Sequence, residues 1–361
     1  MKIIISAGGT GGHIYPAIAI INKFKAEESN LDILYIGTHN RMEKDIIPKL
    51  GIKYEALEIY GLSKTNLIQN IKNIKLLNKA YRKCLKIMDD FKPDVVIGVG
   101  GYVTMPVIIA AQKRNIFTVL HEQNSIPGKT NKFLAKKANL VCTSYENSNQ
   151  YFKNSKKVIY TGNPCGENAL TTNKIAKSSL GFHKNKKLLL IVAGSLGSMA
   201  INQYFTEFLS LVNDQDNFEV LYITGKTYYD SFIEGKEFSK GVKVVPYLDN
   251  MSGLFSDVDL IISRAGAGTI SEILTMEVPS ILIPSPYVAN NHQYYNALDI
   301  QNKKVGLLIE EKNLNAHRLY KIVQDLLNEN DEYLMFKENL HKLDTKSSSS
   351  IIYKQIKESL K

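Results

Sequence analysis

Cysteine is scarce in this chain, and its placement excludes two classes of small stabilised fold. The sequence holds three cysteines, Cys84, Cys142 and Cys165, which are far apart and lack zinc-ligand spacing. An odd and scattered set supplies neither a disulfide framework nor a structural zinc site. We therefore expect reduced, incidental thiols in a cytoplasmic protein.

Long apolar runs are also missing. No segment approaches about 18 consecutive apolar residues, so we expect no membrane-spanning helix. The chain begins directly in the run KIII, without the apolar region and cleavage site of a secretory signal. The 361 residues are 44% hydrophobic and 22% charged, a composition typical of a globular protein with room for two cores.

Acidic side chains are sparse in the first 160 residues, which hold 12 of them and 24 lysines and arginines. The rest of the chain holds 21 basic and 23 acidic side chains, so the net charge of +10 belongs to the N-terminal half. Basicity confined to one half predicts a localised anionic partner.

Two segments half a chain apart share one pattern. Residues 2–12 read KIIISAGGTGG, and residues 187–198 read KLLLIVAGSLGS. Each is a buried-strand run followed by small residues that let the backbone turn tightly and approach a ligand. A strand, a glycine turn and a helix N-terminus together favour phosphate binding. Because strand-like and helical runs alternate along the whole chain, the sequence predicts an α/β fold of two Rossmann-like doubly wound domains facing a cleft.

The nucleotide motifs of dehydrogenases and NTPases are incomplete here. Ile14 stands where G-x-G-x-x-G needs its third glycine, and the next strand ends in Gly37-Thr38 without a ribose-binding acid. Before GKT at 128–130, Gln123 occupies the place of the first Walker A glycine. Both enzyme classes are therefore disfavoured.

His13 directly follows the first glycine turn, where a helix is expected to begin. A positive helix end disfavours the protonated ring, so a neutral imidazole at this place could act as a general base. The alternative is a histidine that only caps or packs.

Polar and glycine clusters follow other strand-like runs. GVGGYVTMP at 98–106 is a second glycine turn, and HEQN at 121–124 follows the run FTVL. Open α/β sheets bind ligands at the carboxyl ends of their strands, where these residues are expected to lie. The HEQN cluster taken alone is equally consistent with ordinary loop chemistry.

The segment SRAGAGTISEILTMEVPSILIP at 263–284 reads as strand, small-residue loop, helix and strand. Glu272 has two readings: a carboxylate that grips sugar hydroxyls, or a capping box with Thr269. NNHQYYNA at 290–297 follows the next strand and is expected near the same edge. Asp257-Val258-Asp259 matches a metal-binding D-x-D but precedes its strand, so it is predicted at the opposite edge and rejected as a metal site.

Residues 67–88 predict a basic amphipathic helix. At 100° per residue, one stripe faces the core: Leu67, Ile71, Ile74, Leu77, Tyr81, Leu85 and Met88. The other side carries the cations Lys72, Lys75, Lys79, Arg82, Lys83 and Lys86, with Ile68, Leu76 and Ile87 among them. Aliphatic side chains ringed by lysine suit an anionic bilayer surface, although an ordinary solvated basic face is the alternative.

Seven motifs occur in an order that identifies a family. They are GGTGGHIYPA, GVGGY, HEQN with GKTNK, TGNP, AGSLGS, SRAGAGTISE and HQYYNA. Together they resemble the MurG family of peptidoglycan N-acetylglucosaminyltransferases over essentially the whole chain. The resemblance implies a GT-B fold, with an acceptor domain at 1–163, a UDP-sugar domain at 164–344, and a last helix at about 345–361 that packs back on the first domain.

The implied reaction is inverting transfer of N-acetylglucosamine from UDP-N-acetylglucosamine to undecaprenyl-linked lipid I, which gives lipid II. It implies a peripheral enzyme at the cytoplasmic face of the bacterial plasma membrane. Other cell-wall enzymes are further candidate partners, and nucleic acid is not one. No cofactor is expected, because a helix N-terminus and backbone N–H groups can stabilise the leaving diphosphate without metal.

The resemblance also implies roles for individual residues, with His13 assisting deprotonation of the acceptor. Contacts to the donor or the acceptor diphosphate are implied for Thr10, Gly11, Gly12 and Asn124. The UDP-sugar is implied to lie against Ser195, Leu248, Ala267, Gly268, Thr269, Ile270, Ser271, Glu272 and Gln293. Within that set, Glu272 is implied to hold the ribose and Leu248 to lie beside the uracil. The acceptor is implied to contact Gly9, Gly100, Gly101 and Tyr102.

Three departures from the family pattern weaken some of these assignments. Gly166 stands where an arginine after GNP would contact the donor, so that contact is lost. The third glycine loop is AGSLGS in place of the commoner GGS-Q-GA, and Thr104-Met105 replaces Ser-Gly.

Two rival functions remain open on the sequence. A UDP-N-acetylglucosamine 2-epimerase, or another GT-B UDP-sugar enzyme, can share the fold and the UDP site. It would have no use for the basic helix. A basic nucleic-acid-binding protein is disfavoured, because no nucleic-acid motif is recognisable and the charge is confined to one half.

Overall fold

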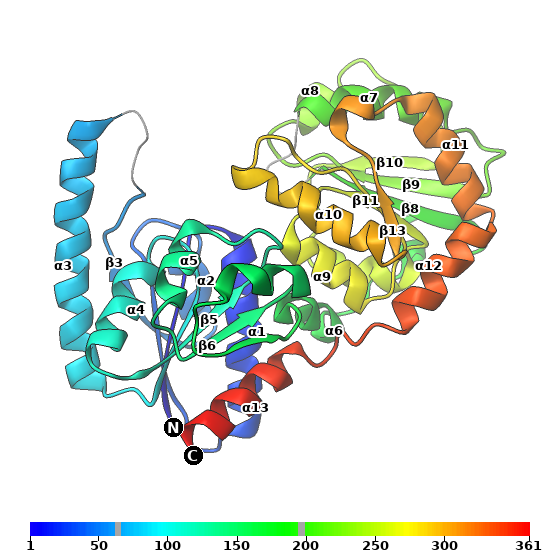
Figure 1. Cartoon of the computed structure of the whole chain (residues 1–361). Helices are drawn as coiled ribbons and strands as arrows, with labels where there is room; N and C mark the ends of the chain where they lie inside the picture. The colour runs from blue at the N-terminus through cyan, green and yellow to red at the C-terminus, as the bar shows by residue number, and fades with distance from the viewer. Residues whose placement is uncertain (62–65, 194–198) are drawn as a thin grey trace. The chain divides into compact units, whose positions relative to one another are not determined.

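The computed structural model describes residues 1–61, 66–193 and 199–361 and divides into two compact units (Figure 1). Unit 1 comprises Met1–Glu167 with Lys346–Lys361, and unit 2 comprises Asn168–Thr345. The stretch 163–187, which lacks periodicity, is structured: it holds two 3₁₀ turns and a short helix, and Phe182 is buried.

Unit 1 is built on a parallel sheet in the order β3-β2-β1-β4-β5-β6-β7. Its strands are β1 (Lys2–Ala7), β2 (Asp32–Thr38), β3 (Lys53–Leu57), β4 (Val95–Gly100), β5 (Phe117–Glu122), β6 (Leu140–Thr143) and β7 (Val158–Tyr160). Its helices are α1 (Gly11–Glu27), α2 (Glu43–Lys49), α3 (Leu67–Phe91), α4 (Thr104–Lys113), α5 (Lys129–Ala135) and α13 (Ser348–Leu360). The 3₁₀ turns are η1 (Glu146–Phe152) and η2 (Pro164–Gly166).

Helices cover both faces of this sheet, which explains why β1 is apolar on both sides. Ile3 and Ile5 pack with α1, α2 and α13, whereas Ile4 packs with α3, α4 and α5. Helix α13 is tied to α1 by the edge-to-face rings of Phe24 and Tyr353, whose centroids are 5.1 Å apart.

Unit 2 repeats this plan with a parallel sheet in the order β10-β9-β8-β11-β12-β13. Its strands are β8 (Lys187–Val192), β9 (Phe218–Ile223), β10 (Val242–Val245), β11 (Leu260–Ser263), β12 (Ser280–Leu282) and β13 (Gly306–Leu308). Its helices are α7 (Met199–Leu211), α8 (Tyr229–Ile233), α9 (Ala267–Thr275), α10 (His292–Asn302), α11 (Ala316–Leu327) and α12 (Asp331–His341), and α6 (Glu167–Thr171) begins at the boundary. The 3₁₀ turns are η3 (Lys177–Leu180), η4 (Met251–Asp257), η5 (Ala289–Asn291) and η6 (Glu311–Asn313).

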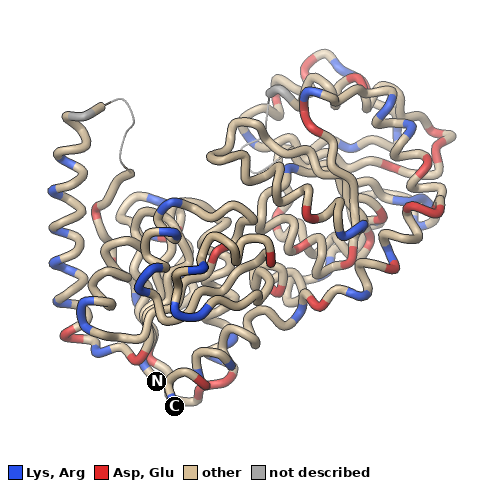
Figure 2. The backbone as a smooth tube through the Cα atoms, in the orientation of Figure 1, with Lys and Arg blue, Asp and Glu red and all other residues tan. Residues whose placement is uncertain are grey.

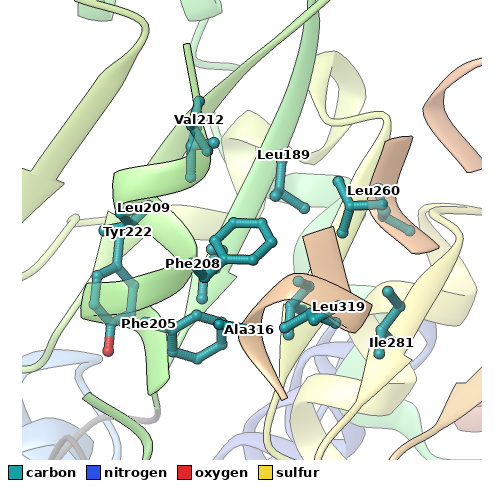
Figure 3. Close-up of a cluster of buried hydrophobic side chains, with 14 of the residues drawn as sticks. Leu189, Phe205, Phe208, Leu209, Val212, Tyr222, Leu260, Ile281, Ala316 and Leu319 are labelled. Atoms are coloured by element: carbon teal, nitrogen blue, oxygen red, sulfur yellow. The ribbon is translucent and has the colours of Figure 1, made fainter. Parts of the chain in front are cut away.

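An aromatic core fills one face of this second sheet. Phe205 and Phe208 of α7 lie beside Leu189 of β8 and Leu319 of α11 (Figure 3). The other face is covered by α9 and α10, through residues such as Ile273. Packing on both faces fixes the strand ends that carry the loops described below.

The cysteines in the cores of unit 1 are packing residues. Cys84 and Cys142 are buried on opposite faces of the sheet, and burial raises the pKa of the Cys84 thiol to about 12. A thiol with so high a pKa carries almost no thiolate at neutral pH and is a poor nucleophile.

Candidate functional site

Both sheets reverse their strand order beside their first strands, β1 and β8. Unit 2 has the 3-2-1-4-5-6 order of dinucleotide-binding folds, and unit 1 adds β7 to the same order. In such folds, ligands bind where the order reverses. In unit 1 this point lies between β1 and β4, so Gly8–Gly12 and Gly100–Tyr102 are neighbours. In unit 2 it lies between β8 and β11, next to Arg264–Gly266.

The two glycine turns of unit 1 pack directly on each other. The Gly8 N–H donates to the Gly100 carbonyl at 3.2 Å. A Cβ on Gly101 would lie 2.4 Å from the Gly8 carbonyl oxygen, and Gly101 has a φ of +90°. Only glycine satisfies both the left-handed backbone and this approach. The structure therefore brings Gly100 and Gly101, which are assigned to acceptor binding, against the turn that leads into Thr10, Gly11 and Gly12.

His13 lies in the first turn of α1 with its ring against the second glycine turn. Its Nδ1 is 3.0 Å from the Gly8 carbonyl oxygen, and a Cβ on Gly100 would meet the ring at 2.5 Å. A carbonyl oxygen only accepts, so Nδ1 carries the proton in the neutral ring. Nε2 then carries the lone pair that can take a proton from a substrate.

The N-terminus of α1 presents backbone donors beside His13. Thr10 is the N-cap in an extended conformation, and its side chain makes no capping bond within the described residues. The His13 and Ile14 N–H groups bond to the Thr10 carbonyl, at 3.1 and 3.3 Å. The N–H groups of Gly11 and Gly12 belong to the helix end that suits an anion.

The HEQN cluster is mainly a buried hydrogen-bond network. Glu122 accepts from the Asn124 N–H at 3.0 Å, from the Gly128 N–H at 3.2 Å and from the Asn131 amide at 2.9 Å. His121 is buried, which lowers its pKa to about 4. Glu122 and His121 therefore shape the loop, and Asn124 is the partly exposed member that remains a candidate contact.

Tyr102 is exposed at the tip of the second glycine turn, with 60% of its surface accessible. Its ring lies against Gly61, where an added Cβ would meet Tyr102 Cζ at 2.5 Å. An accessible ring beside the glycine turns fits the assignment of Tyr102 to a bound acceptor, which stays a prediction.

In unit 2, helix α9 begins at the loop that follows β11. Its N-cap is Gly266, and the Ile270 N–H bonds to the Gly266 carbonyl at 2.9 Å. The first-turn N–H groups of Ala267, Gly268 and Thr269 form a second helix end suited to phosphate. The capping-box reading of Thr269 and Glu272 is wrong, because both residues lie inside the helix and Gly266 takes the cap.

Glu272 is a carboxyl group in an unusual setting. Burial raises its pKa from 4.5 to about 7, and no described residue donates a hydrogen bond to it. An ionisable group that is desolvated without a partner is costly and is typical of a ligand-binding position. With capping excluded, sugar binding is the remaining one of the two readings, and it stays a prediction.

Other residues assigned to the donor lie on neighbouring loops. Gln293, in the first turn of α10, accepts from the Ser285 N–H at 2.9 Å, which directs its amide oxygen to the loop after β12. Leu248 is half-buried after β10 and packs on the α9 side of the core. Ile270 and Ser271 are buried in α9. Ser195 lies outside the described residues. Gly166 is buried in η2.

Sequence reasoning missed the side chains that hold these loops. In unit 2 the Asn296 amide donates to the Ala265 carbonyl at 3.2 Å, and Arg264 pairs with Glu311 at 2.7 Å. In unit 1 the fully buried Glu43 accepts from the Gly9 N–H at 3.2 Å and from the Thr38 N–H at 2.9 Å. The sequence offers one sign of Glu43, an acidic residue a few positions after β2. The polar clusters considered above directly follow their strands, so this residue was not among them.

The D-x-D pair accepts hydrogen bonds from residues at the start of η3 and of β8. Asp257 accepts from the Lys177 N–H and Asp259 from the Leu188 N–H, both at 2.8 Å. Asp259 also pairs with Lys187 at 3.3 Å. In the described part of the chain, no group of three or more His, Cys, Asp or Glu residues is placed to hold a metal ion.

The burial of residues along helix α3 differs in part from the apolar stripe expected from the sequence. Its core-facing residues are Ala80, Cys84 and Met88, with Leu77, Tyr81, Leu85 and Ile87 packed beside them. Ile87 was expected to point away, and Leu76 is half-buried. Conversely, Ile71 and Ile74 were expected in the core but are 60% and 54% exposed. The inward side of these turns instead carries the buried Asn73, whose amide donates to the Gly61 carbonyl at 2.9 Å, and the side chain of Leu67 is not described.

The exposed aliphatic residues of α3 therefore form one surface, which we call the α3 patch: Ile68, Ile71 and Ile74. Ile68 is 83% exposed. Lys72, Lys75 and Lys79 are exposed beside them, and cations recur along the helix in Figure 2. Lys83 is set apart, because it pairs with Glu55 of β3 at 2.8 Å. No described helix is both long enough and apolar enough to cross a membrane.

Models of the N-terminal and C-terminal domains of glycosyltransferase family 28 match residues 3–143 and 188–353. The chain belongs to glycosyltransferase family 28. A family 28 relative from Thermoanaerobacter sp. (strain X514) is 40% identical over 363 residues, covering 99% of each chain. It is named UDP-N-acetylglucosamine--N-acetylmuramyl-(pentapeptide) pyrophosphoryl-undecaprenol N-acetylglucosamine transferase.

Solved structures support the fold. MurG from Acinetobacter baumannii superposes with a TM-score of 0.76 at 24% identity, covering 99% of each chain. A UDP-GlcNAc 2-epimerase from Neisseria meningitidis bound to UDP-GlcNAc gives a TM-score of 0.68 at 15% identity over 99% of this chain. The prediction of two Rossmann-like GT-B domains is confirmed. The fold by itself does not separate transferase from epimerase.

Proposed function

We propose that this protein transfers N-acetylglucosamine from UDP-N-acetylglucosamine to the muramoyl 4-hydroxyl of undecaprenyl-linked lipid I, giving lipid II with inversion. The observation that carries this is the 40% identity, over 99% of both chains, with a family 28 transferase of that name. Peptidoglycan synthesis is the process this reaction serves.

Unit 2 is proposed to bind the donor. The α9 N-terminus faces the diphosphate, and Glu272 accepts hydrogen bonds from the ribose hydroxyls. Departure of UDP leaves negative charge on the diphosphate, which backbone N–H groups at a helix end stabilise. The aliphatic side chain of Leu248 offers no polar group and suits contact with the uracil face.

Unit 1 is proposed to bind the acceptor and activate it. The glycine turns and the α1 N-terminus suit the acceptor diphosphate, and His13 Nε2 takes the proton from the 4-hydroxyl. The new bond forms between that oxygen and the anomeric carbon, while the bond to the UDP oxygen breaks on the opposite face. The proton ends on His13, and UDP leaves as the anion.

One assay separates this proposal from the epimerase alternative. Labelled UDP-N-acetylglucosamine is incubated with the protein, with and without a lipid I analogue. We expect label on the lipid only when the analogue is present. Formation of the manno isomer from UDP-N-acetylglucosamine alone would overturn the proposal in favour of an epimerase.

Donor binding is expected to depend on the charge of Glu272. Its pKa of about 7 means that the carboxylate form grows as pH rises through neutrality. Hydrogen bonds from ribose favour that form, so the KM for UDP-N-acetylglucosamine should fall between about pH 6 and pH 8. Initial rates at fixed acceptor measure this.

Glu272→Gln provides the control, because it keeps the shape but does not ionise. Its KM should be about tenfold or more above the native value at pH 8, with the pH dependence lost. The melting temperature should change little at neutral pH. A native KM that is constant across this range would argue against ribose binding by the Glu272 carboxylate.

We also propose that the enzyme docks peripherally on the cytoplasmic face of the plasma membrane through the α3 patch. Three exposed isoleucines can enter the interface while neighbouring lysines face anionic headgroups. The lipid-linked acceptor supports this location, since its diphosphate and sugar lie at the bilayer surface.

Neutralising the patch is expected to release the protein from vesicles. Lys72, Lys75 and Lys79 changed together to glutamine should weaken binding to phosphatidylglycerol vesicles by about 3 kcal/mol in all, since each cation contributes about 1 kcal/mol. Co-sedimentation at low and high salt measures the effect, and salt should mimic the variant.

A matched control makes the same charge change in unit 2, at the exposed Lys184, Lys240 and Lys321. It should bind vesicles as the native protein does. Equal loss in both variants would show a general charge effect and contradict docking through α3. Activity on a short-chain soluble acceptor should survive in both.

A further inference from the structure

We propose that Glu43 is a positioning residue that acts on His13 through a single peptide group. The Gly8–Gly9 peptide lies between them: its N–H donates to Glu43 Oε2, and its carbonyl accepts from His13 Nδ1. This inference rests on the proposed role of His13 as the base.

The distances make this a continuous chain of hydrogen bonds. The Gly9 nitrogen is 3.2 Å from Glu43 Oε2, and the Gly8 oxygen is 3.0 Å from His13 Nδ1. A carboxylate on the N–H side polarises the peptide, which makes its carbonyl a stronger acceptor. A stronger acceptor holds the proton on Nδ1 and increases the basicity of Nε2, as carboxylates bonded directly to histidine do elsewhere.

Only a carboxylate satisfies the donors around Glu43. Oε1 accepts from the Thr38 N–H at 2.9 Å and from the Thr38 hydroxyl at 2.6 Å, while Oε2 faces the Gly9 N–H. A glutamine amide at this site would turn its NH₂ toward one of the two backbone N–H groups, so one of them would lose its acceptor. Glu43 is fully buried, so water does not substitute readily.

The surrounding glycines preserve this arrangement. A Cβ on Gly8 would lie 2.5 Å from Glu43 Oε1, and one on Gly37 would lie 2.7 Å from Glu43 Cγ. The carboxyl group is therefore packed between the two strand ends, β1 and β2. The sequence feature that disfavoured a dehydrogenase, a second strand ending in Gly37-Thr38, is what makes room for Glu43.

Three of the other titratable groups near this chain have pKa values that burial moves away from neutrality. On β5, His121 interacts with His13, but burial lowers its pKa to about 4. On β2 and β3, Tyr35 and Tyr54 lie near Glu43, and burial raises the pKa of both above the usual 10. Asp45 of α2 is also close enough to act on Tyr54. His39 follows Thr38, and burial raises the pKa of Glu272 in unit 2 to about 7, so the titration is read from the nitrogen-15 shifts of His13 and from kcat at saturating donor.

The first test uses the native protein and needs no activity. Nitrogen-15 shifts of labelled histidine distinguish protonated from bare ring nitrogens, and His13 is assigned by its absence in His13→Gln. We expect the neutral His13 ring to carry its proton on Nδ1. A ring with its proton on Nε2 would overturn the proposal.

The second test compares Glu43→Gln with the native enzyme across pH. We expect kcat to fall about tenfold, and the acid limb of the kcat profile to move down by about 0.5 pH unit. The direction follows from charge: without the carboxylate the imidazolium is less favoured, so the base loses its proton at lower pH. An increased fraction of the Nε2–H form should accompany these changes.

Tyr54→Phe is the matched control. Tyr54 donates to the Thr38 carbonyl at 2.5 Å and packs near Glu43, but it lies outside the chain to His13. It should lower the melting temperature without moving the acid limb or the tautomer. If the native enzyme is active and the acid limb of the kcat profile does not move in Glu43→Gln, Glu43 only stabilises the fold. Native protein without transferase activity would instead defeat the proposed function.

Discussion

Replacing His13 by glutamine is expected to lower kcat for N-acetylglucosamine transfer by about 10²- to 10⁴-fold. The glutamine amide can still donate to the Gly8 carbonyl, which keeps the glycine turn in place, but it cannot take the proton of the acceptor hydroxyl. The KM for the donor should change by no more than about twofold, because the donor is assigned to the other unit. Initial rates with a lipid I analogue measure both.

The control for this variant is His317→Gln. His317 is an exposed histidine on α11, so the change should leave kcat and KM unchanged. Circular dichroism and melting should show both variants folded. A folded His13→Gln enzyme with near-native kcat would mean that the ring only packs against Gly100 and that the base lies elsewhere.

Replacing Gly101 by alanine is expected to cost about 3–5 kcal/mol of folding free energy and most of the activity. Two penalties combine: a φ of +90°, and a Cβ placed 2.4 Å from the Gly8 carbonyl oxygen. The obstructing atom belongs to the backbone, so relief requires a shift of the first glycine turn. That shift moves the oxygen that holds His13 Nδ1. Urea unfolding and the transfer assay measure the two effects.

Gly51→Ala separates the two penalties. Gly51 has a φ of +69°, but nothing lies within 4 Å of a Cβ built there. It should cost only the backbone term, about 1–2 kcal/mol, with kcat unchanged. Equal losses at Gly51 and Gly101 would show that the contact between the turns contributes nothing.

Short sequence patterns were sufficient to predict the strands of the fold and the glycine turns that follow them. Both faces of a central parallel strand are apolar, so KIIISA and KLLLIV are recognisable without any structure. The glycine turns are also recognisable, because small residues directly after such a strand predict a tight turn or a close approach to a ligand. The residues at the two helix ends, such as Gly12 and Gly268, were thereby found from sequence.

Periodicity failed on α3 because a polar residue occupies one of the inward positions. A 100° rule that counts only apolar residues groups Ile71 and Ile74 with the core. In the structure the inward face runs through Asn73, Ala80 and Cys84, so both isoleucines lie beside it and are exposed.

The capping-box reading failed for a different reason. The spacing of Thr269 and Glu272 is local, but the loop from β11 sets where α9 begins.

The sequence by itself determined the family, the two-domain α/β class and the residue types that meet at each sheet edge, because these follow from short-range patterns in order along the chain. Only the tertiary structure decided which side chains touch. Glu43 and Gly9 are joined through strands β1 and β2, and Gly100 meets His13 across β1 and β4. Such contacts join residues far apart in the sequence. They depend on strand register and helix packing, which short sequence patterns do not specify. The chemistry of His13 rests on those contacts.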